Sequence, residues 1–201
     1  MTREGPVSTN DNRARSDPAP TSIGDFGMAV FLVSLSILFI ASLVAFIVVR
    51  NQAEQWPPPG APPLPSGLWF NTLVLIACSV TVHLTLPAVR KGNQARLCGL
   101  LSATMALGVL FLFLQALNWR EIYLAQVPTK ATLFEFTFFA LTGLHAAHVL
   151  GGLVLLGWVT SKAFQGRYSP TCHPGVRYSV AYWHFLDVAW LVIFVVLISS
   201  S

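Results

Sequence analysis

Charged residues are scarce in this chain. They account for 10% of its 201 residues, whereas hydrophobic residues account for 54%. A soluble globular domain usually carries about 25% charged residues, so the composition excludes an ordinary water-soluble domain. The net charge of +4 is modest, and the distribution of the basic residues follows membrane topology, as described below. Nothing in the composition indicates nucleic-acid binding.

Cysteine is equally scarce. The three cysteines are Cys78, Cys98 and Cys172, and none belongs to a CxxC or CxxCH motif. An odd number of cysteines without these motifs argues against a disulfide framework, a cysteine zinc site and covalently attached c-type haem. We therefore expect three unpaired thiols.

Long apolar runs are abundant. A transmembrane helix needs about 20 mainly apolar residues, and five runs meet this length, at 27–49, 67–89, 97–117, 136–161 and 180–198. The first run contains no ionisable residue, and the second contains only His83. We predict an all-α integral membrane protein in which residues 25–201 form a single domain of five transmembrane helices.

The segment before the first apolar run has a different composition. Residues 1–24 are rich in Pro, Ser, Asn and charged residues, which is typical of a disordered tail. The apolar run that follows has 23 residues, longer than the ~7–15 residues of a signal-peptide core. We therefore predict that this first helix is an anchor and not a secretory signal.

Basic residues alternate between the two ends of the predicted helices. One side carries nine of them, namely Arg3, Arg13, Arg15, Arg90, Lys91, Arg96, Lys162, Arg167 and Arg177. The other side carries three, namely Arg50, Arg120 and Lys130. Because cytoplasmic loops are enriched in Lys and Arg, this bias predicts a cytoplasmic N-terminus and an external C-terminus.

Four polar residues stand inside the last two apolar runs. They are His145 and His148 in the fourth run, and His184 and Asp187 in the fifth. A charged side chain near the bilayer centre costs roughly 2.5–3.5 kcal/mol on insertion scales, so it usually has a partner. At ~1.5 Å per residue, His145 and Asp187 both fall near the middle of the membrane. We predict an intramembrane polar cluster of these four residues, in which Asp187 hydrogen-bonds His145 or His148.

Three other roles for this cluster are possible. Haem ligation by two histidines is disfavoured, because histidines at i and i+3 on one helix cannot ligate opposite faces of one haem. A metal site has suitable ligand types in these residues, yet hydrogen bonding explains them without a metal. A proton relay needs a chain of titratable groups, whereas the residues around Asp187 are mainly Val, Leu, Ile and Phe.

Small residues recur in the fourth run. Gly143, Ala147 and Gly151 are spaced by four residues and share one helix face. Such a face allows close approach of another helix in a membrane. We therefore predict that it is a helix-packing face.

Two segments resemble the signatures of a known family. Residues 141–149 read LTGLHAAHV, and residues 182–190 read YWHFLDVAW. They are similar to the F-x-x-T-G-x-H-G-x-H-V and Y-W-H-F-V-D-x-x-W motifs of subunit III of the haem–copper cytochrome c oxidases. Residues 64–69 (LPSGLW) and 114–119 (LQALNW) add support. The resemblance extends from about residue 25 to residue 198. It is to the five-helix form of this subunit, which many bacteria have.

This resemblance implies a non-catalytic accessory subunit in the bacterial cytoplasmic membrane. Haem and copper would belong to its partners, the catalytic subunit I and subunit II, which couple oxygen reduction to proton translocation. The subunit would stabilise the catalytic subunit and hold phospholipid. No catalytic, cofactor-binding or metal-binding residue is then expected in this chain.

The chain departs from the family pattern at three positions. Leu35 occupies the position at which the family usually has a glutamate in the first of these five helices. Asn118 replaces the usual acidic residue near the end of the third helix, and Ala146 replaces the glycine after the first histidine of the fourth. Without an acid in the first helix, we expect the subunit to act through packing and bound lipid and not by carrying protons.

We expect lipid in a cleft between the first two helices. Arg50, Arg90 and Lys91 are the predicted contacts for phosphate headgroups at its two ends.

Other functions remain open from the sequence. A related accessory protein of nitric oxide reductase systems shares the five-helix pattern. A small transporter would be expected to show inverted repeats and broken helices, which the sequence lacks. A di-haem cytochrome would show the spectrum of bis-histidine haem in the purified chain.

Overall fold

The computed structural model describes residues 23–59, 61–125 and 133–200. Most of the predicted tail, residues 1–22, lies outside this range. The helices are α1 (Ile23–Gln52), α2 (Gly67–His83), α3 (Thr85–Arg90), α4 (Gln94–Ala125), α5 (Leu133–Phe164) and α6 (Pro174–Ile198). Taking α2 and α3 as one span, five helices are long and apolar enough to cross a membrane. The predicted all-α fold with five spans is confirmed.

The helices are longer than the apolar runs that predicted them. α4 continues to Ala125, and α6 already begins at Pro174. The prediction counted only apolar residues, whereas a helix continues through polar residues at the membrane surface. Pro174 suits a helix start, because its fixed φ is helical and the first N–H groups of a helix have no partner within it.

The second span is interrupted at Leu84, between α2 and α3. Pro87 explains the position, because proline has no backbone N–H and its ring crowds the carbonyl four residues earlier, that of His83. Gly92, with a φ of 66°, then ends α3 in the left-handed conformation. The Asn93 side chain accepts a hydrogen bond from the Arg96 N–H at 3.0 Å, at the start of α4. This short turn places α4 directly beside α2.

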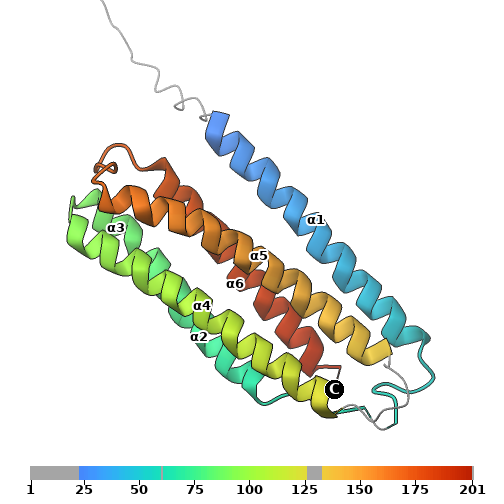
Figure 1. Ribbon diagram of the computed structural model, residues 1–201. Helices are drawn as coiled ribbons and strands as arrows, with labels where there is room; N and C mark the ends of the chain where they lie inside the picture. The colour runs from blue at the N-terminus through green and yellow to red at the C-terminus, as the bar shows by residue number, and fades with distance from the viewer. Residues whose placement is uncertain (1–22, 60, 126–132, 201) are drawn as a thin grey trace, which may run out of the picture.

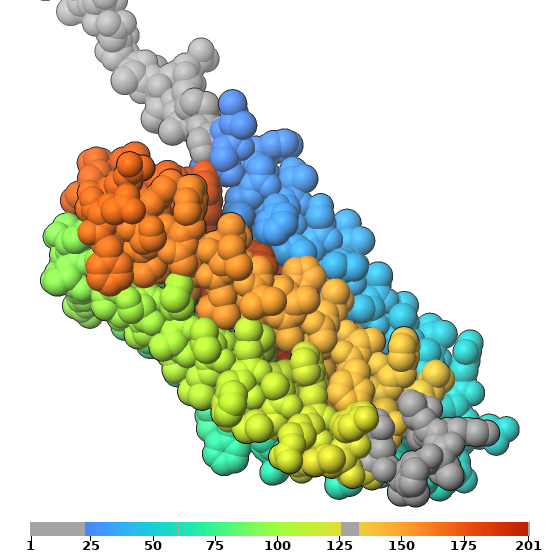
Figure 2. Space-filling model, in the orientation of Figure 1, coloured from blue at the N-terminus to red at the C-terminus, as the bar shows by residue number. Residues whose placement is uncertain are grey.

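Four spans form a closed ring. α2 packs on α4, α4 on α5, α5 on α6, and α6 on α2. α1 lies outside the ring and contacts α5 and α6, and Figure 1 shows it running along one side of the bundle, far from α2 and α4. In the space-filling view, α1 forms one edge of the molecule (Figure 2). We call α2, α4, α5 and α6 the four-helix ring.

Large aromatic side chains fill the middle of the ring. Trp183 and Trp190 of α6 and Phe111 of α4 are at most 1% exposed. Close contact between α5 and α6 depends on Gly152, where an added Cβ would lie 2.7 Å from the Tyr182 ring. The ring is therefore packed by aromatic residues of α6 against a small residue of α5.

The predicted helix-packing face is wrong for contacts within the chain. A Cβ added at Gly143 or at Gly151 would have no atom within 4 Å among the described residues, and Ala147 is exposed. Spacing by four residues identifies a stripe of small side chains, but it does not say which side of the helix meets a neighbour. The neighbouring stripe, which contains Gly152, makes the close contact.

Candidate functional site

His145 is fully buried at the centre of the molecule, among aromatic rings from three other helices. The centroid of its ring lies 6.2 Å from that of Phe39 on α1, 5.6 Å from Phe111 on α4 and 5.1 Å from Trp190 on α6. Neither ring nitrogen has a hydrogen-bond partner among the described residues. His145 therefore acts here as an aromatic packing residue that joins α1 to the four-helix ring.

His148 lies one turn further along α5 and packs on the same phenylalanine. Its ring centroid is 5.2 Å from that of Phe39. Its Nδ1 lies 2.7 Å from the backbone carbonyl oxygen of Leu144, a hydrogen bond to its own helix. Its backbone carbonyl accepts a further hydrogen bond from the Tyr182 hydroxyl at 2.9 Å. Of these two hydrogen bonds only the one from Tyr182 joins α5 to α6, and neither involves Asp187.

His184 and Asp187 face α2. The Ser79 hydroxyl lies 3.0 Å from His184 Nδ1, and the same nitrogen lies 3.9 Å from Asp187 Oδ2. The rings of His83 and His184 have centroids 5.6 Å apart. Asp187 is buried, whereas the His184 side chain is 38% exposed. We call Ser79, His83, His184 and Asp187 the α2–α6 polar patch.

The four predicted polar residues therefore do not form one cluster. The prediction that Asp187 hydrogen-bonds His145 or His148 is wrong, because neither Asp187 oxygen has a hydrogen-bond partner among the described residues. The calculated depths give the height of each residue in the membrane, but not the direction in which its side chain points. Trp190, one turn further along α6, takes the place beside His145.

Ser79 and His83 are the residues of this patch that the cluster prediction missed. Both lie on α2 at i and i+4, which places them on one face of that helix. This spacing was visible in the sequence, but it gave no sign that this face of α2 would meet α6.

The patch does not have the geometry of a nucleophilic triad. In a Ser–His–Asp triad the hydroxyl and the carboxylate contact different ring nitrogens. Here Ser79 and Asp187 both approach Nδ1 of His184. No group of three or more His, Cys, Asp or Glu side chains within the described ranges is arranged to hold a metal ion. What these side chains can do in this arrangement is donate and accept hydrogen bonds inside the membrane.

Three further hydrogen bonds between helices use residues outside the predicted cluster. Asn71 Nδ2 on α2 donates to Gln115 Oε1 on α4 at 2.7 Å. Trp190 Nε1 on α6 donates to the Thr72 hydroxyl on α2 at 3.1 Å. Trp119 Nε1 on α4 donates to the Thr142 hydroxyl on α5 at 3.0 Å. These bonds cross three of the four helix pairs of the ring, and each satisfies a polar group that would be costly to leave alone in lipid.

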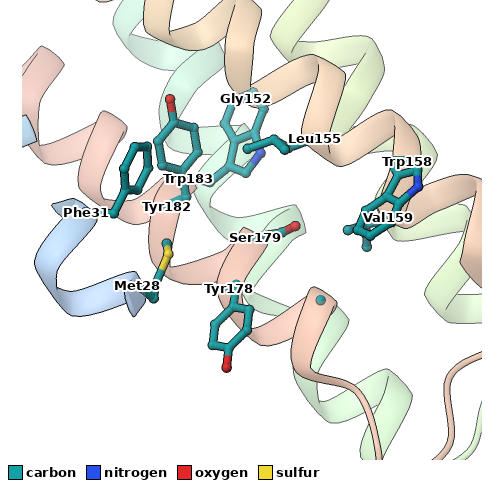
Figure 3. Close-up of a pocket in the computed structure, with 11 residues that line it drawn as sticks. Met28, Phe31, Gly152, Leu155, Trp158, Val159, Tyr178, Ser179, Tyr182 and Trp183 are labelled. Carbon is teal, nitrogen blue, oxygen red and sulfur yellow. The ribbon is translucent and has the colours of Figure 1, made fainter. Parts of the chain in front are cut away.

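Apolar pockets follow both sides of α1. One lies between α1, α5 and α6 near the start of α1, and Figure 3 shows Met28, Phe31 and Tyr182 around it. A second is lined by α1 and α6, and a third by α1 and the start of α5. The expected cleft between the first two helices is wrong, because α1 makes no contact with α2 among the described residues.

Two cationic side chains lie near the first of these pockets, and neither is one of the predicted headgroup contacts. Lys162 Nζ lies 3.4 Å from the ring centroid of Trp158, and that tryptophan lines the pocket. Arg177 forms an ion pair with Asp25 of α1, next to the pocket residue Tyr178. Lys162 and Arg177 therefore both lie beside residues that line this pocket.

The predicted headgroup contacts lie in different places. Arg50 is at the end of α1, beside Val49, which lines the third pocket. Arg90 ends α3 and Lys91 follows it, and both are exposed. α3 contacts α2, α4 and α6 and not α1 among the described residues. Arg90 and Lys91 are thus remote from the surface of α1.

Comparison with known proteins places this architecture in a family. A sequence model of the family "Cytochrome c oxidase subunit III" matches residues 17–200. Cytochrome c oxidase subunit 3 of Synechocystis is 36% identical over 172 residues, which cover 85% of this chain and 72% of that protein.

Two further relatives carry the same name. The subunit 3 of Thermostichus vulcanus is 32% identical, over 85% of this chain and 84% of its own length. That of Gallus gallus is 31% identical, over 84% of this chain and 66% of its own length. With its five membrane-spanning helices and the motifs around His145 and Asp187, the chain belongs to the cytochrome c oxidase subunit III family.

Proposed function

We propose that this chain is the accessory subunit of a haem–copper terminal oxidase in a bacterial cytoplasmic membrane, where it stabilises the catalytic subunit and holds phospholipid along α1. The observation that carries the proposal is the family match over residues 17–200, which covers all five spans. Haem and copper belong, in this proposal, to the catalytic subunit I and to subunit II. The chain itself supplies packing surfaces and lipid contacts.

Leu35, at the position where the family usually has a glutamate, agrees with a structural role for the subunit. Leu35 is 7% exposed and packs in the hydrophobic core. A leucine cannot bind or release a proton. Several buried polar residues of the ring form hydrogen bonds between helices, as Asn71 does with Gln115. These features support a subunit that acts by packing.

Lipid binding along α1 is supported by the pockets and their cations. The pocket of Figure 3 has walls of apolar and aromatic side chains from three helices, which suit an acyl chain. Lys162 and Arg177 stand at the same end of the molecule as Trp158 and Tyr178 of that pocket. Basic residues at a membrane surface attract anionic lipid headgroups.

Co-purification tests the assignment to an oxidase. The tagged chain is extracted in mild detergent, and the proteins that elute with it are identified. We expect a haem-containing catalytic subunit, and oxygen consumption by the eluted complex. Elution of the chain alone, or with an enzyme that reduces nitric oxide and not oxygen, would contradict the proposal.

Lipid analysis of the same complex tests the second part. Lys162→Glu reverses a charge beside the pocket, whereas Lys91→Glu reverses a charge at the same end of the molecule but remote from α1. We expect Lys162→Glu to lower the amount of anionic phospholipid that co-purifies, as measured by mass spectrometry, and Lys91→Glu to leave it unchanged. Equal lipid content in both variants would contradict lipid binding at this pocket.

A further inference from the structure

Three buried amide side chains lie between α2 and α4. Asn71 of α2 and Gln115 of α4 are fully buried, and Asn118 of α4 is 3% exposed. Asn71 Nδ2 donates to Gln115 Oε1 at 2.7 Å. However, Asn71 Oδ1, Gln115 Nε2 and Asn118 Nδ2 have no hydrogen-bond partner among the described residues. We call Asn71, Gln115 and Asn118 the α2–α4 amide cluster.

Turning the amide groups around does not satisfy the cluster. The hydrogen bond between Asn71 and Gln115 uses the nitrogen of one amide and the oxygen of the other. The second oxygen and the second nitrogen of this pair therefore stay unpaired whichever way the two groups are oriented. A polar group buried without a hydrogen bond is costly. With Asn118, the cluster has two donors and one acceptor that need a partner between the helices.

The amides occupy two successive levels between α2 and α4. Gly67 and Asn71 are four residues apart on α2, and Gln115 and Asn118 are three apart on α4, so each pair shares one face of its helix. The Asn118 amide lies against Gly67, because a Cβ added at Gly67 would overlap Asn118 Oδ1. The missing side chain of Gly67 thus leaves the space that the Asn118 amide occupies, one turn away from Asn71.

The separation of the two levels suits a water molecule. Side chains three or four residues apart on a helix have Cβ atoms about 5–6 Å apart. This separation is too long for one hydrogen bond of about 2.9 Å and close to the length of two such bonds in series. A buried water typically makes about three hydrogen bonds to polar groups that are otherwise unsatisfied. The cluster offers three such atoms.

We propose that the α2–α4 amide cluster binds one water molecule inside the four-helix ring. The water accepts hydrogen bonds from Gln115 Nε2 and Asn118 Nδ2 and donates one to Asn71 Oδ1. It fastens α2 to α4 at the end of the ring where α2 begins. The site is separate from the pockets along α1. It does not depend on the proposed function, because every atom that holds the water belongs to this chain.

Nuclear magnetic resonance of the full chain in lipid nanodiscs tests the site directly. The chain is deuterated and labelled with nitrogen-15, and NOE and ROE cross-peaks between the water signal and the side-chain N–H protons are recorded. A long-lived bound water gives cross-peaks of opposite sign in the two experiments, whereas hydrogen exchange gives the same sign. We expect opposite signs at Gln115 and Asn118. We expect no such pair of peaks at Gln165, which is exposed and contacts only fast-exchanging surface water.

Substitutions test whether the two amides share one water. Asn118→Leu keeps the approximate shape of the side chain and removes its N–H donor, so we expect the water cross-peak of Gln115 to fall at least threefold. Gln115→Met is expected to do the same to the cross-peak of Asn118. The control is Thr160→Val, because the Thr160 hydroxyl donates to the Leu156 carbonyl of its own helix. We expect it to leave both cross-peaks unchanged.

The measurement on the unaltered chain needs no variant to fold. Absence of the opposite-sign cross-peaks at Gln115 or at Asn118 would overturn the proposal. So would a cross-peak of Gln115 that Asn118→Leu leaves unchanged, because the two amides would then not share a water molecule.

Discussion

The four-helix ring and α1 are both apolar, yet they are held in the molecule differently. In the ring, side chains hydrogen-bond from one helix to the next, as Asn71 does with Gln115 and Trp190 with Thr72. In α1, the hydroxyls of Ser34 and Ser36 donate to carbonyl oxygens of α1 itself. The ring is linked by directional bonds between helices, whereas these polar groups of α1 are satisfied locally.

α1 joins the ring through aromatic contacts and an ion pair at one end. Phe39 packs on His145, His148 and Phe185, and Asp25 pairs with Arg177. Only 17% of the most apolar stretch of α1 is buried, against 33% to 44% in the other spans. Because lipid tails are as apolar as leucine, apolar contact by itself drives little helix association in a membrane. The comparison indicates a ring that holds itself together and an outer helix that shares its contact surface with lipid.

The largest expected effect is a difference in cysteine labelling between the two sides of the membrane. It shows on which side the Asp25–Arg177 ion pair joins α1 to α6. Cys172 is exposed in the loop before α6, at the same end as the Asp25–Arg177 pair, whereas Cys78 and Cys98 are buried. If the N-terminus is cytoplasmic, an impermeant maleimide will label Cys172 in inside-out vesicles and not in intact cells.

Ser199→Cys in a Cys172→Ser background supplies the reverse control. Ser199 follows the end of α6 and is exposed, so its thiol is expected to react in intact cells. The opposite labelling pattern would invert the predicted orientation.

Removing a tryptophan from the interior of the ring is expected to cost more than removing one from its outer surface. Trp190 is fully buried against Phe111 and His145, so Trp190→Ala is expected to lower the free energy of unfolding in detergent by about 3 kcal/mol. Trp158, 60% exposed, is the matched control, and Trp158→Ala is expected to change it by less than about 0.5 kcal/mol. Equal losses would show that the interior of the ring is not more tightly packed than its outer surface.

Two adjacent glycines of α5 test the contact between α5 and α6. Gly152→Ala places a Cβ against Tyr182, at 2.7 Å before any adjustment, and is expected to destabilise the chain by about 1–3 kcal/mol. A Cβ at Gly151 would have no atom within 4 Å among the described residues. Gly151→Ala is therefore expected to be neutral or to stabilise the helix by up to about 1 kcal/mol. Thermal unfolding of both variants decides, and similar destabilisation would contradict the packing described.

The smallest expected effects are the coupling energies of two single polar interactions. One lies within the ring and the other joins α1 to α6. A double-mutant cycle of Asn71→Ala and Gln115→Ala is expected to give a coupling energy of about 0.6–1.7 kcal/mol, typical of hydrogen bonds in membranes. The cycle of Asp25→Ala and Arg177→Ala joins two partly exposed side chains, so we expect about 0.2–1 kcal/mol. The second coupling should also weaken as salt is raised. A salt-resistant coupling larger for Asp25 and Arg177 would reverse the comparison.

The sequence predicted the spans and the family well, because both depend on local features. Apolar runs of membrane length give helices wherever they fall, and the motifs around His145 and Asp187 are contiguous stretches of chain. The helix ends were predicted less well, since residues such as Trp119 and Arg120 continue α4 beyond its apolar run.

The arrangement of side chains could not be predicted in the same way. Spacing places Gly143, Ala147 and Gly151 on one face, but the direction of that face depends on how the other helices pack around α5. For the same reason, similar depth did not bring Asp187 to His145. The position of α1 against α5 and α6, which moved the expected cleft away from α2, is likewise a property of the whole bundle.

The central claim is that this chain acts on the oxidase through packing and lipid, and it is tested most directly by comparing the complex with and without the chain. Initial oxygen turnover, proton stoichiometry and the half-time of inactivation during turnover are measured on both preparations. We predict unchanged initial turnover and stoichiometry and a shortened half-time without the chain. An immediate fall in proton uptake with an unchanged half-time would contradict the account and make Asp187 the first candidate for a proton-carrying group.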